Sequence, residues 1–252
     1  MRLRVATFNI RNVTDRYEER RPLLGEAFCQ IDAHVIGLQE VGFRKGKRQD
    51  DFLAESARRM GREYLSLESR SERLPEFGNA IMFTTGNVSA HEELKLGDGR
   101  TAQRALFTLP GQRTMWFANT HLHHVPGEPE VRDQQVEAIV AWMAEAPEAD
   151  ATVVVGDFNA PPSEPAYARM KGAGYRSASF EANGAEPEVT WPSGIQAPTM
   201  DTDGDPNCLD YIWVRGWVRV LSARVAANAH ARGDATLYPS DHFAVVADVE
   251  VG

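Results

Sequence analysis

Short apolar runs recur along the whole chain, and several of them alternate apolar with polar positions. Clusters of Gly, Pro, Asn and Asp separate these runs at short intervals, which is typical of β-strands joined by turns. The pattern predicts nine strands, over Leu3–Asn9, Val35–Gln39, Ala80–Thr84, Ala105–Leu109, Met115–His121, Thr152–Gly156, Tyr211–Arg215, Val218–Val225 and His242–Val249.

Helical patterns are fewer. The clearest covers Pro129–Glu145, where Val131, Ile139 and Met143 fall near helical spacing and charged residues occupy the other face. Weaker patterns predict helices over Arg21–Asp32, Gln49–Met60 and Glu164–Gly172. Because strands outnumber helices, we expect two packed β-sheets with the helices outside them.

Composition indicates an ordinary globular protein. The chain has 252 residues, of which 42% are hydrophobic and 25% charged, so a disordered chain and a fibrous repeat are excluded. We find no repeat, low-complexity tract or flexible linker, and therefore expect a single domain over residues 1–252. The two cysteines, Cys29 and Cys208, lie far apart without CxxC spacing, which excludes a disulfide framework and a thiolate zinc knuckle.

The charge and hydropathy of the chain indicate which partners and which cellular compartment we expect for it. The chain carries 36 acidic and 27 basic residues, a net charge of −9, which opposes indiscriminate binding to a polyanion. Any contact with nucleic acid must therefore be local. The sequence shows neither the pattern of a signal peptide nor an apolar run as long as a membrane span. We expect a cytoplasmic protein without stable membrane insertion, and a monomer by default.

Polar residues that could take part in catalysis or metal binding stand at the ends of apolar strands. Any single one of them is usually a cap or a turn residue, so the hypothesis rests on their number. Their members are mainly oxygen donors and imidazoles, which suits Mg²⁺ or Mn²⁺ better than structural zinc, and magnesium favours phosphate chemistry. The group comprises Asn9, Glu40, His121, Asp157, Asn159, Asp210, Asp241 and His242.

Seven segments in a fixed order carry a resemblance: TFNIRN, GLQEV, FGNAIMF, NTHLHH, GDFNAPP, LDYIWV and SDHFAVV. In this order the chain resembles the endonuclease/exonuclease/phosphatase family of deoxyribonuclease I-like, metal-dependent phosphohydrolases. The resemblance implies an α+β fold, a four-layer α/β/β/α sandwich of two mixed sheets with outer helices. It also implies Mg²⁺-dependent hydrolysis of a phosphate ester, chiefly a phosphodiester in a nucleic acid, a nucleotide or a lipid head group, with Mn²⁺ as an alternative ion.

The resemblance assigns roles at the metal and the attacking water. Glu40 would be the principal metal carboxylate, with Asn9 beside it and Asp241 near the same ion. Asp157 would orient or deprotonate the attacking water, and Asn159 would hold that water or a phosphate oxygen. In-line attack on phosphate needs a positioned water and neutralised oxygens, which these residue types supply.

The resemblance also assigns the hydrogen-bond donors to phosphate. His121 and His242 would donate to the phosphoryl oxygens as negative charge develops, and Asp210 would fix the ring of His242 and raise its pKa. The chain departs from deoxyribonuclease I at one position. Asn79 stands where that enzyme has a glutamate partner for its first histidine, so the partner of His121 is open, and Asn79 is a second-rank candidate for substrate contact.

Further substrate contacts are weaker predictions. Arg11 and Arg104 are candidates for phosphate binding. His123 alternates onto the strand face of His121 and is a candidate for contact with the leaving group, whereas His124 should point the other way. Trp191 lies in a Gly- and Pro-bearing segment that should overhang the site.

The motifs disfavour two alternative functions. A dinuclear zinc hydrolase is disfavoured because HLHHVPG lacks the Asp-His pair of an HxHxDH motif, and GDFN lacks a second aspartate. A catalytically silent phosphate-binding module of the same fold is disfavoured because every motif keeps its reactive side chain. A phosphomonoesterase stays an alternative, and the substrate, endo or exo cleavage and the number of metal ions stay open.

Overall fold

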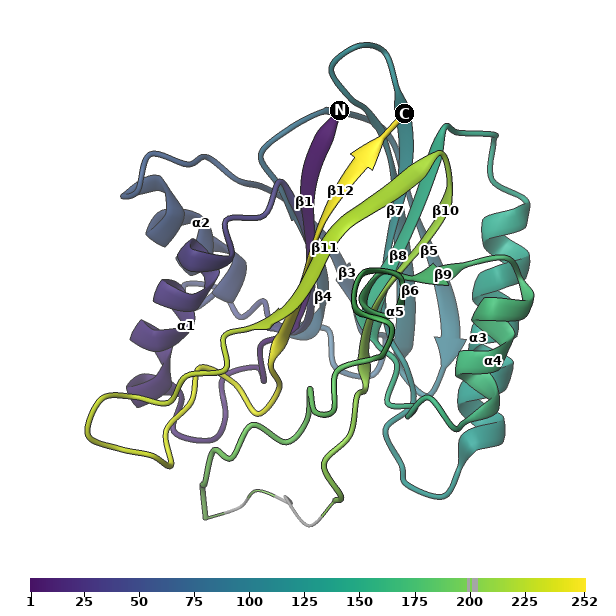
Figure 1. Ribbon diagram of the computed structural model, residues 1–252. Coiled ribbons are helices and arrows are strands. Elements are labelled where there is room, and N and C mark those ends of the chain that lie inside the picture. Colours follow the sequence, from purple (N-terminus) through teal and green to yellow (C-terminus); the bar gives the residue numbers. More distant parts are fainter. Residues whose placement is uncertain (199, 201–203) are drawn as a thin grey trace.

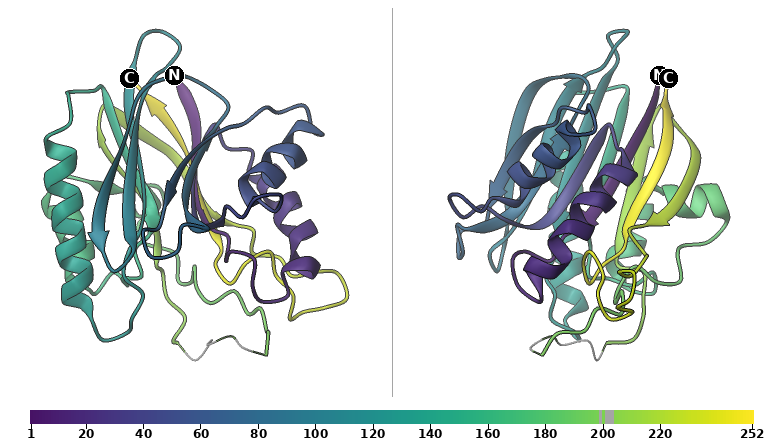
Figure 2. Two further views of the ribbon diagram at one scale, coloured as in Figure 1. Left: turned by 180° about the vertical axis from the view of Figure 1, so that it is seen from behind. Right: turned by 90° about the vertical axis from the view of Figure 1, so that its left-hand side faces the viewer.

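Two β-sheets pack face to face and helices cover their outer faces (Figures 1 and 2). The computed structural model describes residues 1–198, 200 and 204–252. Each sheet has six strands within these residues. The predicted four-layer sandwich is therefore confirmed.

The first sheet is mixed. β1 runs parallel to β2, while the other neighbouring strands pair antiparallel. Helices α1 (Tyr17–Ile31) and α2 (Gln49–Arg58) cover its outer face. In spatial order the strands are β11 (Val218–Ala226), β12 (Ala244–Val251), β1 (Arg2–Asn9), β2 (Val35–Gly42), β4 (Phe77–Phe83) and β3 (Leu65–Arg70).

The second sheet is also mixed, because β7 and β8 run parallel. Helices α3 (Pro129–Ala144) and α4 (Pro165–Gly172) cover its outer face, and the short α5 (Ala178–Asn183) packs against β11 and β10. In spatial order the strands are β5 (Asn87–Gly97), β6 (Arg100–Thr108), β7 (Thr114–His121), β8 (Ala151–Asp157), β10 (Asp210–Gly216) and β9 (Arg176–Ser177).

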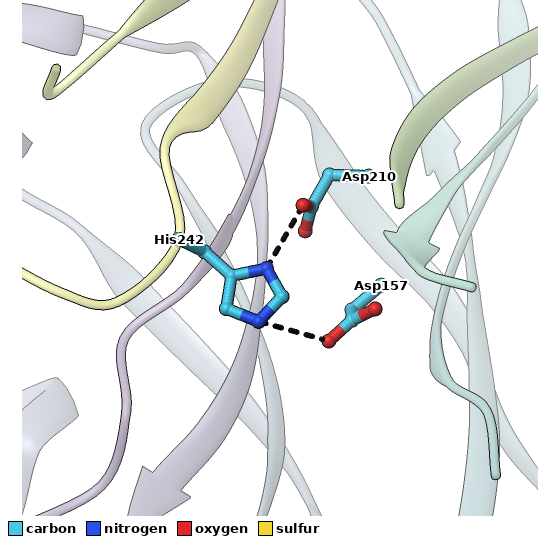
Figure 3. A group of neighbouring side chains, drawn as sticks. All are labelled: Asp157, Asp210 and His242. Carbon is cyan, nitrogen blue, oxygen red and sulfur yellow. Dashed lines mark hydrogen bonds and ion pairs between the residues drawn. The ribbon is translucent and has the colours of Figure 1, made fainter. Parts of the chain in front are cut away.

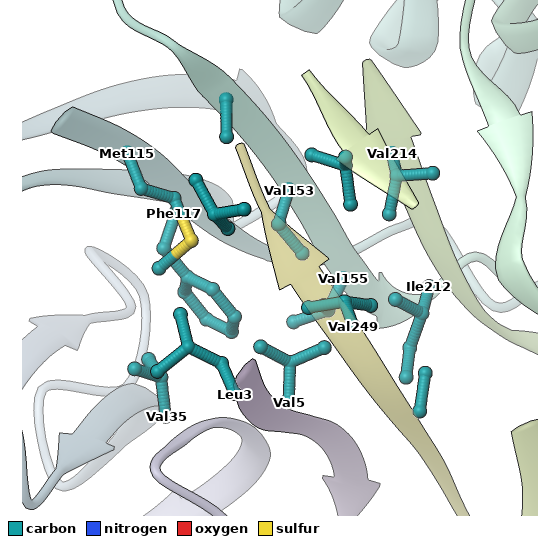
Figure 4. Close-up of a cluster of buried hydrophobic side chains, with 14 of the residues drawn as sticks. Leu3, Val5, Val35, Met115, Phe117, Val153, Val155, Ile212, Val214 and Val249 are labelled. Atoms are coloured by element: carbon teal, nitrogen blue, oxygen red, sulfur yellow. The ribbon is translucent and has the colours of Figure 1, made fainter. Parts of the chain in front are cut away.

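Three apolar clusters hold the layers together. Between the sheets, side chains such as Val5, Phe117 and Val155 are fully buried and interdigitate (Figure 4). A second cluster joins the first sheet to α1 and α2, and a third joins the second sheet to α3 and α4. Since each sheet buries both faces, its strands are nearly continuous apolar runs, which is why the sequence pattern reveals them.

All nine predicted strands are present, with shifted ends, and so are the four predicted helices. The sequence analysis missed β3, β5, β9 and α5. β5 lies at a sheet edge and is largely solvent-exposed, so it lacks the apolar pattern of an inner strand. One predicted boundary is wrong: β12 begins at Ala244, so His242 lies in the loop before the strand.

The sheets approach closely at Gly37 in β2. A Cβ atom there would lie 2.4 Å from Cγ2 of Val155 and 2.7 Å from Oδ1 of Asn119. Asn119 cannot move away cheaply, because its Oδ1 accepts from Gln39 and its Nδ2 donates to the carbonyls of Leu38 and Ala80. The absence of a side chain at Gly37 thus sets the spacing of the two sheets at this point.

We predict that Gly37→Ala destabilises the protein. Overpacking a buried site typically costs about 1–3 kcal/mol, and the added methyl would also displace a buried amide network. Gly172→Ala is the matched control, because a Cβ at Gly172 would meet nothing within 4 Å. Denaturant unfolding of both variants tests this, and equal stabilities would contradict it.

Candidate active site

A cleft of about 1160 Å³ opens at one edge of the sandwich, where His121 ends β7 and Asp157 ends β8. These strand ends lie at the opposite side of the molecule from the two chain termini (Figure 1). Its lining comes from loops at the ends of strands in both sheets, which brings together residues far apart in sequence. The lining includes Glu40, His121, Asp157, Asn159, Asp241 and His242.

Asp157 lies at the centre of the site. It is the last residue of β8 and its side chain is buried. Asn9 Nδ2 donates to its Oδ2 over 2.9 Å, and the backbone N–H of Asn159 donates to its Oδ1 over 2.9 Å. The Nε2 atoms of His121 and His242 lie 3.4 and 3.5 Å from Oδ2. One carboxylate therefore touches four of the predicted site residues.

His242 is held between two carboxylates (Figure 3). Its Nδ1 lies 2.9 Å from Oδ2 of Asp210, the first residue of β10, which pairs in register with Asp157 of β8. The loop that carries His242 is tied to β1, because Ser240 Oγ donates to the carbonyl of Asn9. The predicted pair of Asp210 and His242 is thus present, and both side chains are buried.

Burial and charge set the protonation of this centre in opposite directions. Burial alone would lower the pKa of His242, but the carboxylates of Asp210, Asp157 and Asp241 outweigh it and raise that pKa to about 10. Burial raises the pKa of Asp157 to about 7, against the attraction of His242. Burial and the nearby charge of Arg100 hold the pKa of His121 well below 6.5. The two histidines are therefore differently charged at neutral pH.

Glu40 reaches the centre from β2 through a local irregularity. Its φ is 53°, and the pairing of β2 with β4 shifts register between Leu38 and Val41, a bulge that re-aims the side chain. Asn9 Nδ2 lies 3.2 Å from Glu40 Oε1, and Asn12 Nδ2 donates to Oε2 over 2.9 Å. Asn9 therefore bridges Glu40 and Asp157.

Asp241 joins the same centre through Arg11. Arg11 Nη1 lies 3.3 Å from Asp241 Oδ2, and its Nε donates to Asp15. The carboxylates of Asp241 and Glu40 both raise the pKa of Arg11, although burial opposes them. Arg11 therefore lines the cleft between two of the predicted metal carboxylates.

The three neighbouring histidines do not follow strand alternation. β7 ends at His121, so the expectation that His124 points away is wrong: its Nδ1 lies 2.8 Å from Arg100 Nη2, and it lines the cleft. His123 also lines the cleft, and its Nε2 lies 2.6 Å from Glu128 Oε2. Irregular backbone after His121 turns both rings toward the opening.

Asn79 and Arg104 lie differently from what the sequence suggests. Asn79 lines the cleft, but its Nδ2 donates to Thr101, so it is not the partner of His121. Arg104 pairs with Glu92 and lies over the ring of Trp142, on the outer face of the second sheet. It stands four residues up β6 from Arg100, or about 13 Å along the strand. The structure does not bring it to the cleft.

Three residues near the site carried no signal that we used. Arg100, the first residue of β6, places Nη1 2.8 Å from His121 Nδ1 and is the partner of His121 that the sequence left open. Asn12 contacts Glu40, and TFNIRN already contained it. Arg20 is fully buried in α1 and donates to the carbonyls of Ile10, Asn12 and Pro239, so it fastens the two loops that carry site residues.

The loop that overhangs the cleft confirms one expectation in part. Trp191 lines the cleft, and its ring lies 6.4 Å from that of His242, centroid to centroid. The backbone of Trp191 pairs with Asn207 in an isolated bridge. Residues 199 and 201–203 of the same segment lie outside the described residues.

The donor set fits a hard divalent cation. Asp157, Asp210 and His242 place ligand atoms within 4.8 Å of one another, but a protonated His242 has no lone pair for a metal, so only the two carboxylates of this group could ligate one. Oδ1 of Asp210 is buried without a hydrogen-bond partner among the described residues, and Glu40 and Asp241 add carboxylates at the same cleft. Oxygen-rich sets of this kind suit magnesium or manganese.

The chain belongs to the endonuclease/exonuclease/phosphatase family, because the model of that family matches residues 6–242. Comparison with curated proteins found no match. None of the helices in the described residues is long and apolar enough to cross a membrane.

Solved structures share the fold. An endonuclease/exonuclease/phosphatase from Bacteroides vulgatus is 22% identical with a TM-score of 0.78, and both chains are covered fully. The human Nocturnin catalytic domain with bound sulfate is 21% identical with a TM-score of 0.77, over 100% of this chain and 94% of that one. D. rerio TDP2 complexed with a single-strand DNA product is 16% identical with a TM-score of 0.78, over 99% of each chain. At these identities the comparison establishes the fold.

We predict that Asp210→Asn lowers the pKa of His242, because it removes the nearest anion that holds the imidazolium. NMR titration of the metal-free protein measures this. A raised histidine pKa stabilises the folded state fully below the unfolded value of about 6.5, and that stabilisation is lost as pH rises toward about 10. The unfolding free energy should therefore fall less over this interval in the variant.

Asp248→Asn is the matched control for this prediction. It also removes one carboxylate from a hydrogen-bonded pair, with Arg4, but its partner belongs to a surface contact on β12 and β1. An unchanged pKa of His242 in Asp210→Asn, or an equal shift in both variants, would contradict the assignment.

Proposed function

We propose that this protein is a Mg²⁺-dependent hydrolase that cleaves a phosphodiester by in-line attack of water. One observation supports this most strongly: Glu40, Asn9, Asp157, His242 and Asp210 form a continuous chain of contacts that crosses from one sheet to the other at the cleft. A set of buried acids and imidazoles is costly to maintain without a function, because each buried charge must be compensated.

Asp157 is the proposed base for the attacking water. Its Oδ2 faces the two histidines, while Asn9 and the backbone of Asn159 hold the carboxylate in one orientation. A carboxyl whose pKa lies near neutrality can accept a proton from water more readily than an ordinary one. The side chain of Asn159 donates to the carbonyl of Leu122, which fixes it beside that water.

His242 and His121 are the proposed donors to the phosphoryl oxygens. His242 carries positive charge because Asp210 holds its Nδ1, and its Nε2–H faces the reacting centre. Donors preorganised at a point where negative charge develops lower the barrier, and the loss of one costs on the order of 100-fold or more in rate.

Glu40 and Asp241 would hold the cation, with Asn9 beside them. Asn9 uses its amide nitrogen toward Glu40 and Asp157, while its Oδ1 accepts from the backbone of Arg11. When bound, Mg²⁺ supplies positive charge that neutralises the non-bridging oxygens of phosphate. Mn²⁺ is the alternative ion, and Arg11 and His123 are additional proposed substrate contacts at the cleft.

The proposed substrate is a nucleic acid, a nucleotide or a lipid head group. The lining of the cleft includes Arg11 and Arg73 although the chain carries a net charge of −9, so the attraction for phosphate is local. D. rerio TDP2, which shares the fold, forms a complex with a single-strand DNA product, and this supports a phosphodiester as the substrate here. A single domain over residues 1–252, a monomer and a cytoplasmic location stay predictions.

We predict that the protein releases nitrophenol from bis(p-nitrophenyl) phosphate when Mg²⁺ is added. Asp157→Asn and His242→Asn should each lower kcat by at least about 100-fold, because they remove the base and the charged donor. The absorbance of nitrophenol, with circular dichroism to confirm folding, measures both effects. Asp248→Asn should retain the native rate, because its carboxylate pairs with Arg4 outside the cleft.

The results of this assay distinguish the proposed phosphodiesterase from a silent binding module and from a phosphomonoesterase. No turnover with Mg²⁺ or Mn²⁺ on diesters, despite a rise in Tm on addition of the metal alone, would favour the silent binding module. Faster release from p-nitrophenyl phosphate than from the diester would favour a phosphomonoesterase. Full activity of Asp157→Asn would overturn the assigned base.

A further inference from the structure

Arg100 forks between two imidazoles at the cleft. Its Nη1 lies 2.8 Å from Nδ1 of His121, and its Nη2 lies 2.8 Å from Nδ1 of His124. His121 is buried and His124 is exposed at the mouth of the cleft. The planar guanidinium of Arg100 thus contacts the Nδ1 atom of each histidine.

This geometry decides the position of the hydrogen on each ring. A guanidinium only donates, so the Nδ1 atom it contacts must offer a lone pair. A neutral imidazole that accepts at Nδ1 carries its hydrogen on Nε2, and an imidazolium cannot accept at all. Both His121 and His124 are therefore neutral Nε2–H donors while Arg100 stays in place.

The hydrogen on His121 consequently points to the reacting centre. Its Nε2 lies 3.4 Å from Oδ2 of Asp157, the carboxylate that also faces Nε2 of His242. His242 also presents an Nε2–H to the reacting centre. Its Nδ1 faces the carboxylate of Asp210 and not a cation, so this ring is the charged imidazolium. The centre thus has one charged donor and one neutral donor.

Within the part of the chain that the structure describes, Arg100 is the group that contacts Nδ1 of His121. Among the described residues, the hydrogen bonds and ion pairs of the His121 ring are those with Arg100 and Asp157. Asn79, on β4 of the opposite sheet, donates to Thr101. Without Arg100, Nδ1 of His121 would be free to take the hydrogen, and Nε2 would then present a lone pair to an anionic substrate.

We propose that Arg100 is a positioning residue that holds His121 and His124 in the Nε2–H tautomer, so that both rings present a hydrogen-bond donor to the phosphate ester. Its effect on rate rests on the proposed hydrolase function, whereas its effect on the two tautomers does not. His124 becomes a second neutral donor, at the open side of the cleft. Arg100 acts through the rings, so its loss should lower kcat and leave KM little changed.

The first test measures the tautomers in the metal-free protein. Ring ¹⁵N NMR distinguishes a protonated nitrogen from one with a lone pair. We expect Nε2–H alone for His121 and His124 in the native protein, and a mixture that includes Nδ1–H in Arg100→Met. Arg100→Lys keeps the charge but lacks the planar fork, so it should not restore both rings. Native Nδ1–H rings, or unchanged tautomers in Arg100→Met, would overturn the proposal.

The second test uses kinetics with bis(p-nitrophenyl) phosphate and Mg²⁺. Arg100→Met should lower kcat by about tenfold to 100-fold. In a His121→Asn background the same change should cost much less, because the ring it positions is already gone. Arg169→Met is the matched control: Arg169 lies on α4 outside the lining of the cleft and pairs with Asp133, so its loss removes the same charge without touching an imidazole.

The positioning role of Arg100 and the hydrolase function can each be overturned without the other. If Arg100→Met raised KM with kcat unchanged, Arg100 would bind the phosphate directly and the positioning role would be overturned. If the losses from Arg100→Met and His121→Asn multiplied in full, the two residues would act independently, with the same consequence. If the native protein hydrolysed no diester, the hydrolase function would fail while the NMR result still decided the role of Arg100.

Discussion

A buried carboxylate at the junction of two sheets imposes the arrangement of the site. Asp157 ends β8 in a position almost closed to solvent, where an unpaired negative charge would be costly. The amide of Asn9 from the other sheet, a backbone N–H and two imidazoles surround it. Each of these groups either donates to the carboxylate or lies within 3.5 Å of it. The groups proposed for catalysis are therefore also those that compensate the buried charge.

The sandwich makes this arrangement possible because both sheets send strand ends to the same edge. β1 and β2 run parallel in the first sheet, and β7 and β8 run parallel in the second. The carboxyl ends of these strands carry Asn9, Glu40, His121 and Asp157. The close approach at Gly37 and the buried amide of Asn119 set how near the two sets of side chains lie.

Polar residues at strand ends could be predicted from the sequence, and the arginines that hold the site could not. Asn9, Glu40 and Asp157 were visible because inner strands of a doubly covered sheet are apolar, so a polar residue near their ends stands out. Arg20 and Arg100 were not visible, because arginine is common and nothing in the local pattern distinguishes a buried fork from an exposed side chain. Arg104 is the opposite case: the sequence made it a candidate for phosphate binding, but it lies on β6 away from the cleft, beside Glu92 and Trp142.

The sequence by itself determined the two packed sheets with outer helices, the positions of the inner strands along the chain and the residue types at their ends, because apolar periodicity and turn residues are local properties of the chain. The tertiary structure decided which groups touch. It placed Arg100 and not Asn79 against His121, and it turned His124 into the cleft where strand alternation ends. Hydrogen bonds between distant segments depend on angles and distances of an ångström, and these arise only when the two sheets have packed.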